Sequence, residues 1–380
     1  MPSRLRALPL IALLAAAAAC DDTPKVDPKD RAEGLYIKGT SEYLQGNFDQ
    51  ALLSFNEMKQ YAPKDPRLPA AVGEVYLSMG KYTEAIAEFQ AALEIDPKRS
   101  TTWSRIGFIQ VQLGKDEDAQ SSLRKALALY PNDFNALEQL GELHLKRGEK
   151  DEAIRHFVLA SQTSPDTLKP PLLMRGVEVL LQDKRNAEAF ALLQKAASQG
   201  VRAPEVLTAL GDEQVRAGKL DEAAGSYREA ATKSPRDPAL WELVGEIYAS
   251  QGKSADALSA FRESLRVKDR AIVHVAIARL HLAREDRKAA EEELELALGT
   301  VSGSDLRELT ELSDLLVTFG RKPDALRILA ALSSEPEMAQ DVDLQLRTAR
   351  LARELKDAEM VKTVCARVTG KDGGGAVACP

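Results

Sequence analysis

Apolar side chains recur along this chain at the spacing of amphipathic helices. Residues 69–79 carry them at i, i+3, i+4 and i+7, the positions that share one helix face, namely Val72, Val75, Tyr76 and Met79. Gly80 interrupts this pattern. A second helix is expected from Thr83, which we predict to be its N-cap, up to Pro97, which ends it. The stretch therefore predicts two helices joined by a tight turn.

The pattern of this helix pair repeats every 34 residues. Four sets of small or helix-breaking residues keep that interval: Ala51, Ala85, Ala119 and Ala153; Gly39, Gly73, Gly107 and Gly141; Gly46, Gly80, Gly114 and Gly148; and Pro63, Pro97, Pro131 and Pro165. The alanine set continues through Ala189, Ala223, Ala257, Ala290 and Ala325. Such self-similarity predicts a helix-turn-helix repeat protein. Gly73 and Ala85 are expected where paired helices cross, so that the two backbones can approach.

The small and aromatic positions resemble those of the tetratricopeptide repeat. The matching residues are Trp103, Ile106, Gly107, Gly114, Ala119, Leu123, Ala126 and Pro131 in the third copy and Trp241, Gly245, Tyr248, Gly252, Ala257 and Phe261 in a later one. The resemblance implies an all-α fold, a right-handed superhelical α-solenoid of about nine repeats, in which each repeat contacts mainly its neighbours. A continuous array of this kind needs no division into globular domains.

The copies differ in quality along the chain. Clear copies lie at 32–65, 66–99, 100–133, 134–167, 204–237 and 238–270, and worn ones lie near 169–203, 271–305 and 306–338. Lys184 and Glu285 stand at turn positions of worn copies, where glycine is expected. The fifth copy is the least regular and is interpreted either as a hinge or as a drifted repeat.

We expect six segments on this basis. They are a signal peptide at 1–19, a lipidated cysteine and tether at 20–31, repeats one to four at 32–167, a degenerate repeat at 168–203, repeats six to nine at 204–338, and C-terminal helices with a glycine-rich tail at 339–380.

The N-terminal residues predict export from the cytoplasm. Arg4 and Arg6 precede an apolar run from Ala7 to Ala19, the layout of a secretory signal peptide. This run of about 13 residues is shorter than the roughly 20 that span a bilayer as a helix. It ends in Ala-Ala-Ala-Cys20, which resembles the lipobox of bacterial lipoproteins and implies that Cys20 is acylated, although the alanines also suit ordinary cleavage. We expect a lipid-anchored, periplasm-facing protein of the bacterial cell envelope, on either membrane.

The remaining cysteines, Cys365 and Cys379, flank a glycine-rich stretch. In an exported chain, such a pair is most simply a disulfide that closes the C-terminal tail. Two free thiols in a disordered tail are the alternative.

The sequence offers no set of residues for catalysis. It lacks a GxxxxGK[ST] phosphate loop, a GxGxxG after a strand, an HExxH zinc motif and a GxSxG elbow. His144 and His281 occupy repeat positions that hold tyrosine elsewhere and are expected to pack between helices, whereas His156 and His274 are expected to be isolated. The run 291–293 of three glutamates is expected to be a solvated helix face. We therefore predict no enzymatic activity, metal, cofactor or small-molecule substrate.

Charge and composition exclude one class of partner. The net charge is −7, and it becomes −9 once Arg4 and Arg6 leave with the signal peptide. No basic patch with interleaved aromatic residues is present, so nucleic acid is not an expected partner. A hydrophobic fraction of 44% with only 5% aromatic residues suits a core rich in alanine and leucine.

Resemblance to the family implies that the first helix of each repeat lines a groove. Helical phase predicts the lining residues Tyr36, Thr40, Tyr43, Glu74, Leu77, Arg105, Phe108, Val111, Glu138, Glu142, Lys146, Asp212, Arg216, Glu242, Glu246 and Arg279, followed by Asp314. Acids dominate the middle and aromatic residues the N-terminal end. About half of these residues are expected to pack against a neighbouring repeat instead. The lysine and asparagine pair with which some family members hold a C-terminal carboxylate is missing, because Tyr36 with Thr40 and Ala70 with Glu74 stand at the matching places.

These observations predict a lipid-tethered scaffold that binds envelope proteins through the groove. Tyr36, Tyr43 and Phe108 would be apolar anchors, and Glu142 and Glu246 would select basic side chains. The alternative is an accessory factor in cell-wall or glycan processing that recruits or activates an enzyme. Direct sugar binding is disfavoured, because both tryptophans stand at positions that the repeat uses for packing.

Overall fold

The computed structural model describes residues 27–301, 306–338 and 340–369. Within these residues the regular secondary structure consists of 20 α-helices, without a strand. The chain divides into two compact units, the first ending at Val179 and the second beginning at Leu180. The all-α helical repeat fold predicted from the sequence is confirmed.

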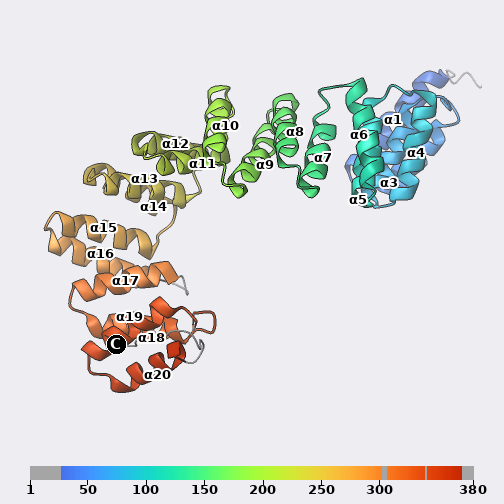
Figure 1. The fold of residues 1–380 in the computed structure, drawn as a ribbon. Coiled ribbons are helices and arrows are strands. Elements are labelled where there is room, and N and C mark those ends of the chain that lie inside the picture. Colours follow the sequence, from blue (N-terminus) through green and yellow to red (C-terminus); the bar gives the residue numbers. More distant parts are fainter. Residues whose placement is uncertain (1–26, 302–305, 339, 370–380) are drawn as a thin grey trace, which may run out of the picture. The chain divides into compact units, whose positions relative to one another are not determined.

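The helices of the first unit follow one another as antiparallel neighbours (Figure 1). They are α1 (Pro28–Leu44), α2 (Phe48–Met58), α3 (Arg67–Ser78), α4 (Tyr82–Ile95), α5 (Ser100–Gln112), α6 (Asp116–Leu129), α7 (Phe134–Lys146), α8 (Lys150–Thr163) and most of α9 (Lys169–Gln182). Each odd-numbered helix up to α7 packs most closely against the helix that follows it. We call these two members the first and second helix of a pair.

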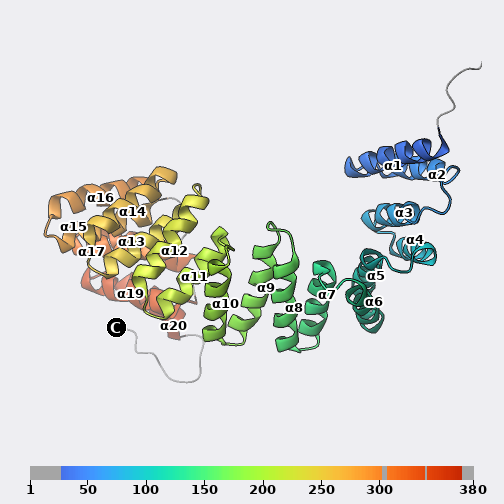
Figure 2. The same ribbon diagram turned by 90° about the horizontal axis from the view of Figure 1, so that it is seen from above.

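The second unit continues the same alternation, seen from another direction in Figure 2. Its helices are α10 (Asn186–Ser198), α11 (Pro204–Arg216), α12 (Leu220–Lys233), α13 (Pro238–Ser250), α14 (Ser254–Val267), α15 (Ala271–Ala283), α16 (Arg287–Thr300), α17 (Leu306–Thr318), α18 (Lys322–Ser334), α19 (Val342–Glu354) and α20 (Ala358–Thr369). The last two, in the segment predicted only as C-terminal helices, pack against each other like the earlier pairs.

A glycine in the first helix makes room for a large side chain of the second. A Cβ added to Gly73 would lie 2.8 Å from Cε1 of Phe89, and one added to Gly211 would lie 2.6 Å from Cε1 of Tyr227. Both rings are almost completely buried. The same contact joins Gly39 with Phe55, Gly107 with Leu123, Gly141 with Phe157 and Gly245 with Phe261. The space predicted at the helix crossing is therefore filled by a side chain.

The repeating alanine lies in the second helix of nine of the described pairs, from α1–α2 to α17–α18. All nine members, from Ala51 to Ala325, have an exposed fraction of 0%. A larger side chain at any of them would have to push the packed helices apart, because protein interiors leave few voids. This explains why alanine persists where the rest of the repeat has drifted.

The turn inside each pair is fixed by backbone geometry. Gly80 adopts a φ of 73°, its N–H donates to the carbonyl of Leu77, and the N–H of Lys81 donates to the carbonyl of Tyr76. This is the Schellman arrangement that ends a helix. It makes Lys81 the N-cap of α4, without a side-chain capping bond, so the N-cap predicted at Thr83 is wrong.

Turns without glycine keep the same geometry. Lys184, Glu285 and Lys356 each have a φ of 60°, in the left-handed region that costs side-chain-bearing residues energy. The worn repeats therefore fold by the same plan as the clear ones. None of the described helices combines the length and the apolar character needed to cross a membrane.

Candidate partner-binding surface

The predicted groove residues all lie in the first helices of their pairs. We call this surface the first-helix face; it is formed by α1, α3, α5 and α7 in the first unit and by α11, α13, α15, α17 and α19 in the second. Each predicted residue, from Tyr36 to Asp314, keeps at least part of its side chain exposed. Their use in binding stays a prediction.

A hollow of about 150 Å³ lies between α1, α3 and α5 and includes Tyr36, Glu74 and Arg105 in its lining. The guanidinium of Arg67 lies 4.7 Å from the centre of the Tyr36 ring. Nε of Arg105 donates to Oε1 of Glu74 over 2.7 Å. The helices thus place cationic, acidic and aromatic groups in one depression.

The three aromatic anchors predicted near the N-terminus are already in contact with the chain. The ring of Tyr36 lies 6.1 Å from that of Phe55, and the hydroxyl of Tyr43 lies 3.0 Å from that of Ser78. Phe108 packs partly against the core between α4 of the preceding repeat and its own helix α5. These side chains remain half-buried, so each can offer only part of its surface to a partner.

In the first unit, an arginine neutralises the acids that the sequence places in the middle of the groove. Nη2 of Arg175 donates to both carboxylate oxygens of Glu142, over 2.8 and 2.9 Å, and its Nη1 donates to Glu178 over 2.6 Å. Burial raises the pKa of nearby Glu138, the Glu142 charge adds to this, and Arg175 opposes it. Arg175 could not be predicted as a groove residue because it lies in the fifth copy, whose irregular spacing obscures the helical phase.

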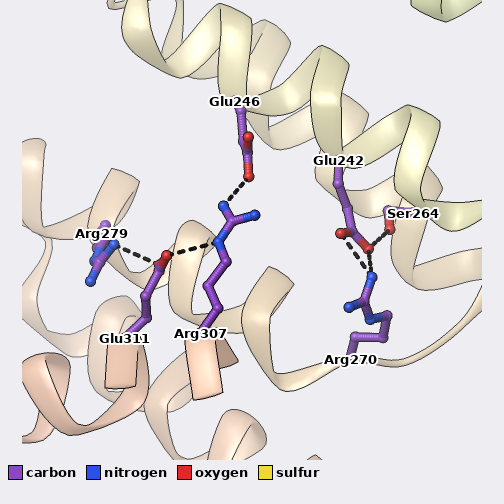
Figure 3. Close-up of polar contacts among 7 residues, drawn as sticks. All are labelled: Glu242, Glu246, Ser264, Arg270, Arg279, Arg307 and Glu311. Atoms are coloured by element: carbon purple, nitrogen blue, oxygen red, sulfur yellow. Dashed lines mark hydrogen bonds and ion pairs between the residues drawn. The ribbon is translucent and has the colours of Figure 1, made fainter. Parts of the chain in front are cut away.

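The second unit has the same kind of pairing on α13, α15 and α17 (Figure 3). Nη2 of Arg307 donates to Glu246 over 2.7 Å, and its Nε donates to Glu311 over 3.2 Å. Nη1 of Arg279 donates to the same Glu311 over 2.8 Å. The acids of this face therefore belong to a network of both signs.

Glu242 is turned further inward than Glu246. It accepts hydrogen bonds from Nη1 of Arg270, over 2.7 and 2.9 Å, and from the hydroxyl of Ser264 over 3.2 Å. Burial raises the pKa of Glu242, although Arg270 and Ser264 favour its charged form. Its pairing within the chain makes Glu242 a packing residue more than a free receptor.

Two larger hollows lie on the first-helix face of the second unit. One, of about 450 Å³, is bounded in part by Asp212, Arg216 and Glu246. The other, also about 450 Å³, is lined by α15, α17 and α19 and contains Arg279, Asp314 and Arg347. Several predicted groove residues thus come together in depressions large enough to accept side chains of a partner.

Two expectations about titratable residues are wrong. His156 is not isolated, because its ring stacks on that of His144 with a centroid separation of 5.0 Å. His274 contacts Asp269 over 2.8 Å and Glu293 over 2.6 Å, so Glu293 is turned away from the solvated face. The other two glutamates of the run, Glu291 and Glu292, are exposed as expected. Helical phase turns Glu293 toward α15, which the three-glutamate run alone could not reveal. In the part of the chain that the structure describes, no group of three or more His, Cys, Asp or Glu residues could hold a metal ion.

Two of the three predicted modification sites lie outside the described residues. These are Cys20 and Cys379, while Cys365 lies in α20. Acylation of Cys20 and the disulfide between Cys365 and Cys379 stay predictions.

Comparison with known proteins extends the picture from geometry to family. Family models described as tetratricopeptide repeats match residues 73–114, 100–133, 122–155 and 208–271. No curated protein matches the chain. One similar solved structure is the first tetratricopeptide repeat domain of Spaghetti (RPAP3) bound to the HSP90 peptide SRMEEVD, with 25% identity over 31% of this chain and 94% of that chain and a TM-score of 0.30. A score this low adds nothing to the family matches. The chain is a tetratricopeptide repeat protein, and its fold is that of a protein–protein interaction scaffold.

Proposed function

We propose that this protein is a non-enzymatic, membrane-tethered scaffold of the bacterial cell envelope. Its first-helix face binds protein partners and so assembles or stabilises an envelope complex, such as a pilus or secretin apparatus, a secretion system, a polysaccharide exporter or an outer-membrane assembly machine. The lipid on Cys20 keeps the repeats near the membrane, where several weak contacts add through their high effective concentration.

The observation that carries the proposal is the set of hollows on the first-helix face. They gather predicted groove residues of both signs, such as Glu74 with Arg105 and Asp212 with Arg216. Surfaces of this composition suit the polar and charged side chains of an unfolded or helical protein segment.

The pairing of acids with arginines changes the partner that this face selects. Glu142 and Glu246 were expected to attract basic side chains, but Arg175 and Arg307 already hold them. A partner must therefore exchange ion pairs with the face, offering an acid to the arginine as well as a base to the glutamate. Such exchange gives specificity more than affinity, because desolvation offsets much of the gain.

Direct glycan binding is not supported by the tryptophans. The indole N–H of Trp103 donates to the carbonyl of Pro97 over 3.3 Å, and Nζ of Lys125 lies 4.3 Å from the ring centre. Trp241 packs partly against the core between α12 and α13. Neither ring is left as an open stacking platform. The glycan-processing alternative therefore requires that the protein recruit an enzyme and not bind the sugar itself.

Site-specific photocrosslinking in intact cells tests the binding surface. A benzoylphenylalanine at Thr40, Leu77 or Arg216, all on the first-helix face, should capture one or a few defined partners. The same probe at Arg124, an exposed residue of the second helix α6, is the matched control. Equal capture at Arg124 and at the first-helix positions would argue against this face as the binding surface.

Metabolic labelling with an alkyne fatty acid tests the tether separately. We expect the mature protein to be labelled and the Cys20→Ala variant to remain unlabelled. An unlabelled wild-type protein would remove the membrane anchor and leave the binding surface in place.

A further inference from the structure

A second depression lies in the first unit, away from the first-helix face. It has a volume of about 600 Å³ and is bounded by the second helices α2 and α4 and by α3 between them. Its lining includes Leu68, Val72 and Tyr76 of α3, whereas the predicted groove is lined by Glu74 and Leu77 of the same helix. None of the predicted groove residues lines this depression, which we call the outer cleft.

The outer cleft has an apolar lining that continues onto the open surface. Leu68 and Phe55 are buried in its wall. At its rim Leu53 is 62% exposed and Ile95 is 40% exposed. At the position of Leu53 the next three repeats carry Ala87, Ser121 and Arg155. The exposed leucine is therefore no requirement of the repeat, and clustered apolar exposure of this kind is typical of a binding surface.

One carboxyl group of the outer cleft is half-buried and makes no hydrogen bond or ion pair within the described part of the chain. In neighbouring repeats the corresponding position is a serine that bonds to the first helix: Ser54 donates to Glu42 over 2.6 Å and Ser122 donates to Gln110 over 2.8 Å. The second repeat instead carries Glu88, which makes no hydrogen bond or ion pair among the residues that the structure describes.

The electrostatic surroundings of Glu88 follow from this position. Burial raises the pKa of its carboxyl group, and the charge of Lys59 only partly opposes that shift. Asp49 adds a second acid to the lining, so the cleft carries two acids against one base. A half-buried carboxylate in an apolar wall is stabilised when a cation supplies the missing hydrogen bonds.

We propose that the outer cleft binds an amphipathic helix of a partner protein, which inserts leucine-type side chains and brings a lysine or arginine to Glu88. The volume suits a few side chains, and helices of this kind commonly dock through apolar anchors one turn apart. Because Leu53 and Ile95 extend the apolar surface beyond the cleft, the occupant is a chain segment and not a small amine. This surface is independent of the first-helix face and allows the scaffold to hold two partners at once.

Three synthetic helical peptides test the proposal against the full mature chain. Each is capped, fluorescein-labelled and about 14 residues long, a length at which a good helix former is partly helical in water. Each has two leucines one turn apart and, one turn further on, lysine, glutamine or glutamate. By fluorescence anisotropy the lysine peptide should bind about tenfold more tightly than the glutamate peptide, with glutamine between them, as expected for a charge-assisted hydrogen bond.

Two variants in the cleft locate the binding. Glu88→Gln should remove most of the preference for lysine over glutamate and leave the glutamine peptide almost unaffected. Leu53→Ser should weaken the binding of all three peptides by a similar factor. Because Leu53 is 62% exposed, the variant should keep its fold, which circular dichroism checks. Glu142→Gln, on the first-helix face, asks whether the peptides bind there instead. Glu292→Gln, at an exposed residue of α16 outside both surfaces, is the matched control and should leave the affinities of all three peptides unchanged.

Three outcomes would overturn the proposal: no peptide binds, the three peptides bind alike, or both cleft variants bind like the wild type. If Glu142→Gln weakens the peptides and Leu53→Ser does not, they bind the first-helix face instead. That result would support the proposed function while removing the outer cleft as a site. Failure of the crosslinks at Thr40, Leu77 and Arg216 would remove the first-helix face as a binding surface and leave the outer cleft in place. The two proposals can therefore fail separately.

Discussion

At the scale of single residues, the turns distinguish the clear repeats from the worn ones. Gly148 has a φ of 78° and Lys184 a φ of 60°, so the same left-handed conformation is met once by glycine and once by a residue with a Cβ. Only glycine adopts this conformation without steric cost. The turn glycines could be predicted from the sequence because their spacing is regular, and so could the positions at which they are missing.

Glycine at the worn turns should stabilise the protein. We expect Lys184→Gly and Glu285→Gly each to raise the free energy of unfolding of their repeat by roughly 0.5–1 kcal/mol, since relief of the left-handed strain exceeds the entropy that glycine adds to the unfolded chain. Gly148→Ala, where a Cβ would meet nothing within 4 Å, should have the opposite effect through φ alone. Native-state hydrogen exchange of the helices next to each turn measures the change, and an equal response of all three variants would contradict it.

The glycine of a helix crossing should respond differently from a glycine on the surface. Gly141→Ala places a Cβ 2.8 Å from the buried ring of Phe157, so we expect a loss of about 1–3 kcal/mol through overpacking. Gly34→Ala, in α1 with nothing within 4 Å, should be neutral or stabilise by up to about 1 kcal/mol. Urea denaturation of the two variants checks the contrast. A neutral Gly141→Ala would show that the ring can move aside.

At the scale of elements, the helix pairs were predictable but the links between first helices were not. The alanines and glycines reveal each pair because they recur at one interval. Arg175 and Arg307 do not recur in that way, and they lie in copies whose phase the sequence obscures. Long, flexible side chains reach across neighbouring helices, so their partners depend on packing geometry and not on spacing alone. The helices that carry the predicted groove residues were therefore predictable, whereas the arginines that neutralise its acids were not. Binding at these residues stays a prediction.

Two histidines, the buried His274 and the half-buried His156, predict opposite pH dependences for the two helix pairs that hold them. Burial alone would lower the pKa of His274, but Glu293 and Asp269 outweigh it, so the pKa is raised above 6.5. Protonated His274 therefore stabilises the α15–α16 pair. Its contribution is complete below about pH 6.5 and is lost as the pH rises through the raised pKa. Burial lowers the pKa of His156, so the α7–α8 pair loses stability as the pH falls below about 6.5.

Hydrogen exchange between pH 5.5 and 8.5, corrected for the intrinsic exchange rate, separates the two effects. Protection of α15 and α16 should decline toward the alkaline end, and protection of α7 and α8 toward the acidic end. His274→Gln should remove the first trend and leave the second. The same trend in both pairs would rule out these assignments.

At the scale of the whole molecule, the irregular fifth repeat is the main open question of the sequence. It was interpreted either as a hinge or as a drifted copy. Helix α9 is continuous from Lys169 to Gln182, and Lys184 gives its turn the geometry of the glycine turns. We therefore expect amides in 168–186 to be protected as well as those in the flanking repeats. Weaker protection there than on both sides would instead support the hinge.

In six of the described helix pairs, the side chain that fills the space beside the crossing glycine comes from the same pair, as Phe89 does for Gly73. The contact that sets the spacing of these two helices thus lies within one repeat, and the neighbouring repeats need only cover its apolar surface. Gain or loss of an entire 34-residue repeat by recombination would leave this contact intact in every repeat that remains. Such a scaffold can lengthen or shorten its reach in whole steps during evolution, without redesign of the parts that stay.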